Sequence, residues 1–168
     1  MVCFDESPVQ LIGETRQPIP ARPGQLERYD YEYRRNGTVN LFVLLDVHRP
    51  WRKVKVTERS AAKDYASCMR ELVDIHCPDA EIIRAVQDNL STHTAGALYQ
   101  AFPPAEARRI SRRLKFHYTP NVASWLNMVE IGISVLRGQC LARRIDDPSD
   151  CVAKSPPGNG NEKLPASA

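Results

Sequence analysis

Three acidic residues stand at positions where a folded chain can bring metal ligands together. Asp5 follows the apolar run 1–4, Asp88 follows the run 82–87, and Glu130 lies in a later segment with a helical pattern. Two strand ends and a helix can converge on one point, and hard divalent cations prefer carboxylate oxygens as ligands. Two ions held about 3.5–4 Å apart can clamp the attacking and leaving oxygens of a phosphodiester displacement.

The length and composition fit one globular domain. The chain has 168 residues, of which 42% are hydrophobic and 26% are charged, as in ordinary soluble proteins. No apolar run approaches the ~18–20 residues of a membrane span, and no signal peptide is visible. The five cysteines are an odd number without a C-x-x-C pair, which argues against a disulfide framework and a cysteine zinc site. We therefore expect a cytoplasmic protein without a membrane partner.

Positive charge is concentrated in the last third of the folded region. The net charge of +3 is too small to indicate nucleic-acid binding by itself. Between residues 108 and 144, however, the sequence contains eight Lys and Arg residues and a single acidic residue, Glu130. Such a stripe suits a polyanionic substrate, although a solvated helix face is the plain alternative. The eight are Arg108, Arg109, Arg112, Arg113, Lys115, Arg137, Arg143 and Arg144.

The first half of the chain reads as strands. Residues 1–4 resemble the end of a buried strand, whereas prolines and glycines in residues 8–37 argue against a long regular element there. Residues 38–47 carry the strongest strand signal, and residues 51–57 alternate apolar and basic side chains. The short connection between them predicts an antiparallel hairpin, with Asp46 as a turn residue.

The second half alternates helices and strands, which predicts an α/β fold. The order is strand, insertion, strand pair, helix, strand, helices, strand and helix, which is the order of ribonuclease H-like folds with a mixed sheet flanked by helices. The ends of the first and fourth main strands are neighbours in that fold, which would bring Asp5 and Asp88 together. The expected elements are helices at 60–75, 94–102, 105–114 and 124–144, and strands at 81–87 and 115–118.

Glu130 belongs to a polar stripe on the last expected helix. Asn127, Glu130, Ser134 and Arg137 are spaced by three, four and three residues, so they share one face. Another side of the helix can pack on the sheet; it carries Trp125, Val129, Leu136 and Cys140. We therefore expect Glu130 to lie outside the core.

The composition changes at Asp146. From there the chain is rich in Asp, Pro, Ser, Gly, Asn and Lys and lacks the apolar residues that a core needs. The sequence predicts a folded domain over residues 1–145 and a disordered tail over residues 146–168.

Three motifs resemble those of a known enzyme family. The first motif is Phe4–Pro8, followed by residues 22–24 and 36–38. The second is Val86–His93, and the third is His117–Pro120 followed by Ser124–Glu130. In this order they resemble the catalytic domain of the DDE endonucleases, in the bacterial insertion-sequence branch of the mariner-like transposases. The resemblance extends from about Val2 to Ile145.

The resemblance implies cleavage and strand transfer of double-stranded DNA with two Mg²⁺ or Mn²⁺ ions, and action as a homodimer. Asp5 would bridge both ions, Asp88 would bind one and Glu130 the other. Asn89 and His93 would orient ligands or contact phosphate. The residues expected to support the site or bind DNA also include Arg109, Arg112, Arg113 and Asn127.

The chain departs from the family pattern at both ends. Family members carry a helix-turn-helix region before the catalytic domain and an ordered region after the last helix, so we expect a core truncated at both ends. Val122 stands where a polar residue is usual. Two alternatives stay open: an inactive transposase remnant with weak, salt-sensitive DNA binding, and a ribonuclease acting on RNA–DNA hybrids. The Ser124–Glu130 motif favours the transposases over the ribonuclease.

Overall fold

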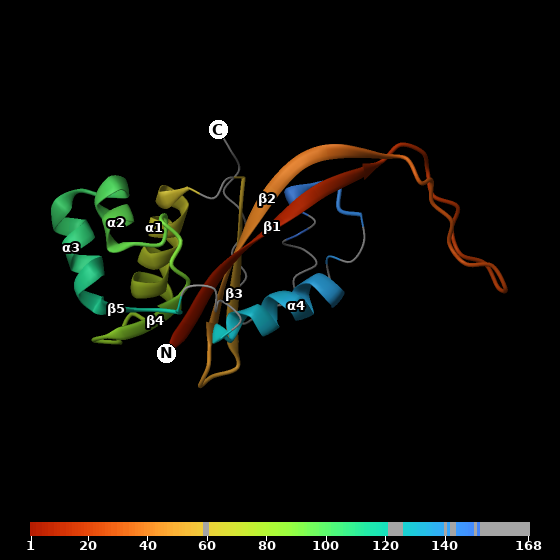
Figure 1. Cartoon of the computed structure of the whole chain (residues 1–168). Coiled ribbons are helices and arrows are strands. Elements are labelled where there is room, and N and C mark those ends of the chain that lie inside the picture. Colours follow the sequence, from red (N-terminus) through yellow and green to blue (C-terminus); the bar gives the residue numbers. More distant parts are fainter. Residues whose placement is uncertain (59–60, 121–125, 140, 142–143, 150, 152–168) are drawn as a thin grey trace.

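A five-stranded mixed sheet carries helices on both faces (Figure 1). The computed structural model describes residues 1–58, 61–120, 126–139, 141, 144–149 and 151. Helices α1, α2 and α3 pack on one face of the sheet, and α4 packs on the other. The strands are β1 (Val2–Glu14), β2 (Tyr33–Asp46), β3 (Trp51–Thr57), β4 (Ile83–Gln87) and β5 (Leu114–Tyr118). The helices are α1 (Ala62–Glu71), a π-helical extension η1 (Leu72–His76), α2 (Ala95–Ala101), α3 (Pro104–Arg113) and α4 (Val129–Gln139).

The strand order is β3-β2-β1-β4-β5, which confirms the ribonuclease H-like topology. β1, β2 and β3 form an antiparallel meander, whereas β4 and β5 run parallel to β1. Cys3 of β1 pairs with Val86 of β4. Asp5 and Asp88 each lie two residues further along these neighbouring strands, so the topology brings them to the same end of the sheet.

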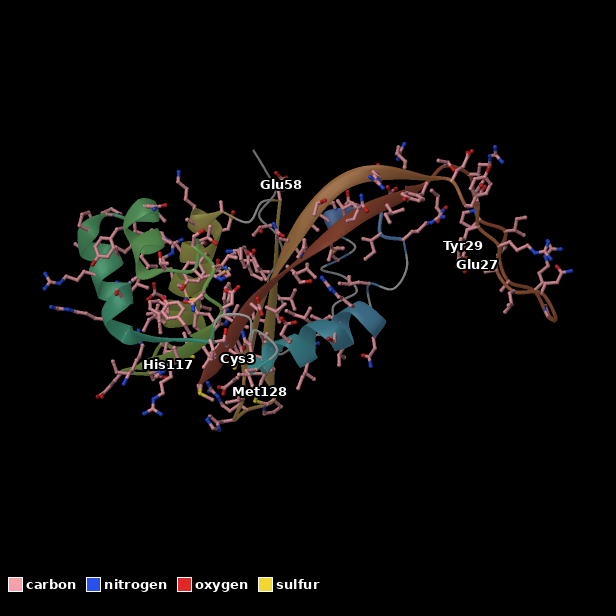
Figure 2. The ribbon with its side chains drawn as sticks, viewed as in Figure 1. Cys3, Glu27, Tyr29, Glu58, His117 and Met128 are labelled. Carbon is pink, nitrogen blue, oxygen red and sulfur yellow. The ribbon has the colours of Figure 1, made fainter. Side chains whose placement is uncertain are left out.

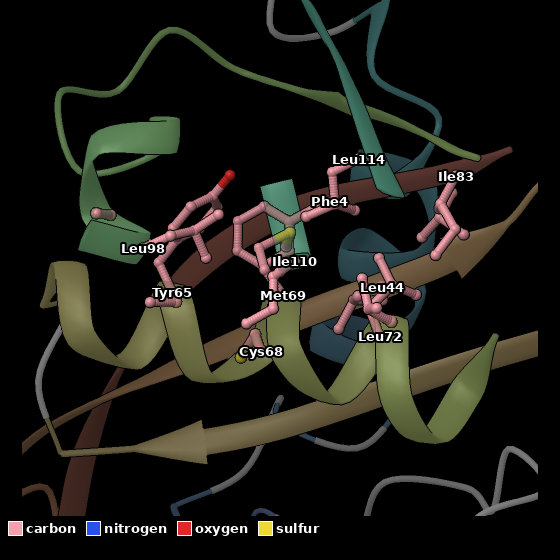
Figure 3. Packing of buried hydrophobic residues seen from close by; sticks show 14 of the residues in the cluster. Phe4, Leu44, Tyr65, Cys68, Met69, Leu72, Ile83, Leu98, Ile110 and Leu114 are labelled. Atoms are coloured by element: carbon pink, nitrogen blue, oxygen red, sulfur yellow. The ribbon is translucent and has the colours of Figure 1, made fainter. Parts of the chain in front are cut away.

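Alternate residues of β1 enter two different cores. Phe4 packs in the layer under α1–α3, where its ring lies 5.6 Å from that of Phe42 and 5.4 Å from that of Tyr65 (Figure 3). Cys3 belongs to the other layer, with Val129 of α4. Side chains alternate between the two faces of a strand, so Asp5 points toward the α4 side.

The expectation of no long regular element in residues 8–37 is wrong. β1 continues through Glu14, and β2 begins at Tyr33, so the two strands form a long ribbon that carries a projecting arm at residues 15–32 (Figure 1). Pro8 is tolerated within β1 because β4 pairs only with Val2 and Cys3, which leaves one side of β1 as a free edge at Pro8.

The hairpin and the first helix follow the prediction. β2 and β3 pair from Asn40↔Thr57 to Asp46↔Trp51. Asp46 accepts hydrogen bonds from the His48 amide at 3.0 Å and the Arg49 Nε at 2.7 Å, which confirms its role in the turn.

Among the described residues, no helix combines the length and apolar character needed to cross a membrane.

The folded region extends beyond the expected boundary at residue 145. Cys151 is fully buried in the core under α4, and Asn36 of β2 hydrogen-bonds to Asp146. The backbone amide of Ile12 donates to the carbonyl of Ile145 at 2.7 Å, which ties this segment to β1. Trp125, Cys140 and residues 152–168 of the expected tail lie outside the described residues. The last helix also begins at Val129, five residues later than expected.

Candidate metal centre

Asp5 is a buried carboxylate in the middle of the sheet. Its side chain is 5% exposed, and its Oδ1 accepts a hydrogen bond from the Glu6 amide at 2.8 Å. Its Oδ2 is buried and has no hydrogen-bond partner in the described part of the chain. Burial, together with the negative charges of Asp88, Glu130 and Glu6, raises the pKa of Asp5 from 3.8 to about 7, despite the opposing hydrogen bond from Glu6. The charges of both other predicted metal ligands, Asp88 and Glu130, therefore act on the Asp5 carboxylate.

Asp88 is held by a buried histidine. Its Oδ1 lies 2.6 Å from Nδ1 of His93, so the ring presents an Nδ1 proton to the carboxylate. The His93 side chain is fully buried, with its ring 5.0 Å from the rings of both Phe4 and Tyr65. These contacts fix the plane of the imidazole and therefore the direction in which Asp88 can face.

A polar network continues from His93 into the core. Gln87 is fully buried, and its Nε2 donates to the carbonyl of His93 at 2.6 Å. The hydroxyl of Tyr65 donates to Oε1 of Gln87 at 2.8 Å. On the other side of the ring, Nε2 of His93 lies 3.6 Å from Oε2 of Glu6. His93 therefore lies between two carboxylates, one on β1 and one after β4.

Asn127, which precedes α4, and Arg137 of α4 contact β1 on both sides of Asp5. Asn127 Nδ2 donates to the carbonyl of Phe4 at 2.8 Å, and Arg137 Nε donates to the hydroxyl of Ser7 at 3.1 Å. Glu130 lies between these anchors on the same stripe and is half-buried. Its charge contributes to the raised pKa of Asp5, so Glu130 lies near enough to Asp5 for the two charges to interact.

The donor set fits hard cations. The buried Oδ1 of Asn127, like Oδ2 of Asp5, has no hydrogen-bond partner among the described residues. Buried acceptors without a donor and mutually repelling carboxylates are both relieved by a cation with oxygen ligands. In their present positions, no three His, Cys, Asp or Glu side chains of the described residues are close enough to hold an ion.

The other predicted site residues have structural partners or lie on the surface. Asn89 donates to the carbonyl of Thr119 at 3.2 Å, which joins the ends of β4 and β5. Arg109 forms a two-point pair with Asp74, at 2.7 and 2.8 Å. Arg112 is exposed on α3.

Arg113 caps the end of η1. Its guanidinium donates to four backbone carbonyls, at distances between 2.5 and 3.2 Å. The sequence predicted that Arg113 supports the site or binds DNA, and in the structure its donors bind backbone carbonyls around the end of η1. The carbonyls belong to Val73, Cys77, Pro78 and Ala80.

Sequence reasoning missed the network behind Asp88. Gln87 occupies an alternate position of β4 together with Ile83 and Ala85, both of which are buried. That alternation was a usable signal, because a glutamine on the core face of a strand must find buried partners. Tyr65 is buried in the core, and its contact with Gln87 joins residues 22 positions apart in the sequence.

Replacing His93 is expected to weaken metal binding. Residues that orient a ligand typically contribute 10–100-fold to metal affinity. We expect His93→Ala to raise the apparent Kd for Mn²⁺ by about this factor, whereas His93→Asn, whose amide can still donate to Asp88, loses less. Calorimetric titration measures the affinities, and urea unfolding identifies any loss of fold. Equal Kd values for folded His93→Ala and wild type would contradict this role.

The sequence matches the family described as DDE superfamily endonuclease over residues 1–151. This chain belongs to that family. The match confirms the predicted family and covers the buried Cys151 that closes the described fold. A comparison with curated protein sequences finds no match.

A solved structure of Mos1 shares this fold. The Mos1 strand transfer complex superposes with a TM-score of 0.55 and 17% identity over 89% of this chain and 44% of that chain. A Mos1 mariner paired end complex with Mn gives a TM-score of 0.49 and 20% identity over 87% of this chain and 44% of that chain. The chain thus spans less than half the length of these Mos1 chains.

Proposed function

We propose that this chain is the catalytic core of a DNA transposase that cleaves and transfers DNA strands. The observation that carries the proposal is the buried Asp5, whose pKa is raised by burial and by the charges of Asp88 and Glu130. A buried carboxylate among like charges is unfavourable unless a cation compensates it. The family match supports an endonuclease, and the three motifs in their order support a transposase.

Each carboxylate has its own support. Asp5 lies on β1 within the sheet, and Glu130 lies on α4. Asp88 follows β4 and is hydrogen-bonded to His93. Two divalent ions, Mg²⁺ or Mn²⁺, would stabilise the attacking and leaving oxygens when bound. We propose that Asp5 contacts both ions, Asp88 one and Glu130 the other. The oxygen-rich donor set supports this choice of metals.

The reaction is a substitution at phosphorus. A water oxygen forms a bond to phosphorus while the bond to the 3′-oxygen breaks, and that oxygen leaves as a hydroxyl after taking a proton. In the transfer step, the released 3′-hydroxyl attacks a phosphodiester of the target and displaces its 3′-oxygen. Asn127 and Arg137 hold α4 against β1, so the position of Glu130 relative to Asp5 is maintained through both steps. The motif resemblance supports double-stranded DNA as substrate and a homodimer as the acting form.

The test is nicking of supercoiled plasmid by the purified chain. We expect conversion to open circles in Mn²⁺ or Mg²⁺, and none in EDTA or in Ca²⁺ alone. A folded chain that nicks in no divalent metal would support the alternative of an inactive remnant. Cleavage of RNA–DNA hybrids in preference to plasmid would support the ribonuclease alternative.

A further inference from the structure

The sheet face that carries Asp5 continues onto two strands with exposed basic side chains. Helix α4 packs against β1 and β2. On β4 and β5, the side chains of Arg84, Lys115 and His117 are exposed. Arg84 pairs in register with Lys115, and Val86 pairs with His117. Paired residues and alternate residues share a face, so the three basic side chains lie together. We call these three residues the basic strand face.

The basic strand face lies on the same side of the sheet as Asp5. Val86 pairs with His117 on one side and with Cys3 on the other, and Cys3 packs in the core under α4. Cys3, Val86 and His117 therefore form a row across the three strands. Figure 2 labels Cys3 and His117 of this row. Asp5 lies two residues beyond Cys3 on β1, so the basic side chains and the Asp5 carboxylate lie on one face of the sheet. Asp88 directly follows β4, and its carboxylate contacts His93 at the end of that strand.

A hollow at the far end of this surface is also basic. Its volume is about 810 Å³, and Arg49, Arg84 and Lys115 are among its lining residues. Asp46 is the acidic residue of the lining, and its Oδ2 is 2.7 Å from Nε of Arg49, so these two charges compensate each other. The positive charge of the hollow therefore comes from Arg84 and Lys115. Arginine and lysine bind phosphate oxygens through charge-assisted hydrogen bonds, so the hollow complements a nucleic-acid backbone.

We propose that the basic strand face and this hollow bind the phosphate backbone of duplex DNA beside the cleaved phosphate. The proposal rests on the proposed function. Asp88 lies four positions after Arg84, which is about 13 Å along a strand. This length equals roughly four base-pair steps of 3.4 Å. For a backbone that follows β4, Arg84 and Lys115 therefore contact phosphates about four nucleotides from the cleavage position.

The matched comparison is with α3, on the other side of the sheet. Arg108 and Arg112 are exposed on α3 and belong to the stripe that the sequence predicted to bind DNA. Duplex binding is measured by fluorescence anisotropy over a range of salt concentrations for wild type, Arg84→Ala/Lys115→Ala and Arg108→Ala/Arg112→Ala. Each lost phosphate contact lowers the slope of log K against log salt by about 0.9.

We expect Arg84→Ala/Lys115→Ala to lower the slope by about 2, and the α3 variant to lower it by less than one. Plasmid nicking should show a higher KM for DNA with kcat within about threefold of wild type, because the replaced residues lie away from the carboxylates. A slope equal to that of wild type for Arg84→Ala/Lys115→Ala would overturn the proposal. A larger loss for the α3 variant, or a change of oligomeric state in place of a loss of DNA affinity, would also overturn it.

The failure of the proposed function gives a different result. In that case the wild-type chain itself does not nick plasmid in Mn²⁺, whatever its salt-dependent affinity for duplex DNA. When wild type both nicks plasmid and binds duplex DNA, only the position of the DNA is being tested. Arg84 and Lys115 are exposed, so urea unfolding should show that the double variant keeps the stability of wild type.

Discussion

Asp5→Asn is expected to stabilise the metal-free protein at pH 8 by up to about 4 kcal/mol. Burial and the neighbouring carboxylates raise the pKa of Asp5 from 3.8 to about 7. At pH 8 the wild-type carboxylate is ionised in the folded state and bears this cost. Asparagine is uncharged and keeps an oxygen for the Glu6 amide, which donates to Oδ1 at 2.8 Å.

The pH dependence gives the sign of the effect. A group whose pKa is raised by folding stabilises the folded state fully below its unfolded pKa, and the contribution is lost as pH rises through the folded pKa. The contribution of Asp5 is therefore lost between about pH 4 and pH 7, whereas asparagine contributes no such change. The advantage of Asp5→Asn in urea unfolding should be near zero at pH 4 and should reach its plateau above pH 7.

Asp46→Asn is the matched control with the opposite sign. Asp46 is also a buried strand residue, but hydrogen bonds from His48 and Arg49 outweigh burial and lower its pKa. A lowered pKa gives stability above the unfolded pKa and loses it as pH falls. Asp46→Asn should therefore destabilise the protein at pH 8. Destabilisation of similar size by Asp5→Asn at pH 8 would show that Asp5 is an ordinary structural carboxylate.

Asp88→Asn is expected to reduce metal-dependent plasmid nicking by at least ~1,000-fold. Loss of a metal-stabilised transition state removes several kcal/mol, and each 1.36 kcal/mol corresponds to tenfold in rate. Asparagine can still accept the hydrogen bond from Nδ1 of His93, so the variant should keep its fold. Initial rates of nicking at saturating Mn²⁺ measure the loss.

The control for Asp88→Asn removes a carboxylate from another part of the molecule. Glu27 is exposed on the arm between β1 and β2, so Glu27→Gln should nick within about twofold of wild type. Both variants are purified in the same way, which also controls for contaminating nucleases. Retention of more than a tenth of wild-type activity by Asp88→Asn would remove Asp88 from the proposed metal ligands.

The sequence predicted the fold through the order of its elements. A strand pair followed by helix, strand, helices and strand allows few arrangements, and the ribonuclease H-like order is the one observed. Strand alternation then determines which side of the sheet Asp5 faces. The sequence also grouped Asn127 with Arg137, and both contact β1, at Phe4 and Ser7, although Asn127 precedes the first residue of α4.

Features that depend on tertiary partners could not be predicted in this way. Local composition argued against a long β1, because the tolerance of Pro8 depends on where β4 stops pairing. Charge counting could not separate Arg113, which caps η1, from exposed Arg112. The basic strand face depends on how far α4 covers the sheet, which neither Arg84 nor Lys115 reveals through its neighbours in sequence.

The most direct test of the account is to count the Mn²⁺ ions bound by the wild-type chain at pH 8, using the loss of the free-ion signal in electron paramagnetic resonance. The account predicts two bound ions per chain for wild type, and weak or no binding for Asp5→Asn. It also predicts that Glu27→Gln binds as wild type does. Equal Mn²⁺ binding by Asp5→Asn and wild type would contradict the claim that Asp5, Asp88 and Glu130 form the metal centre.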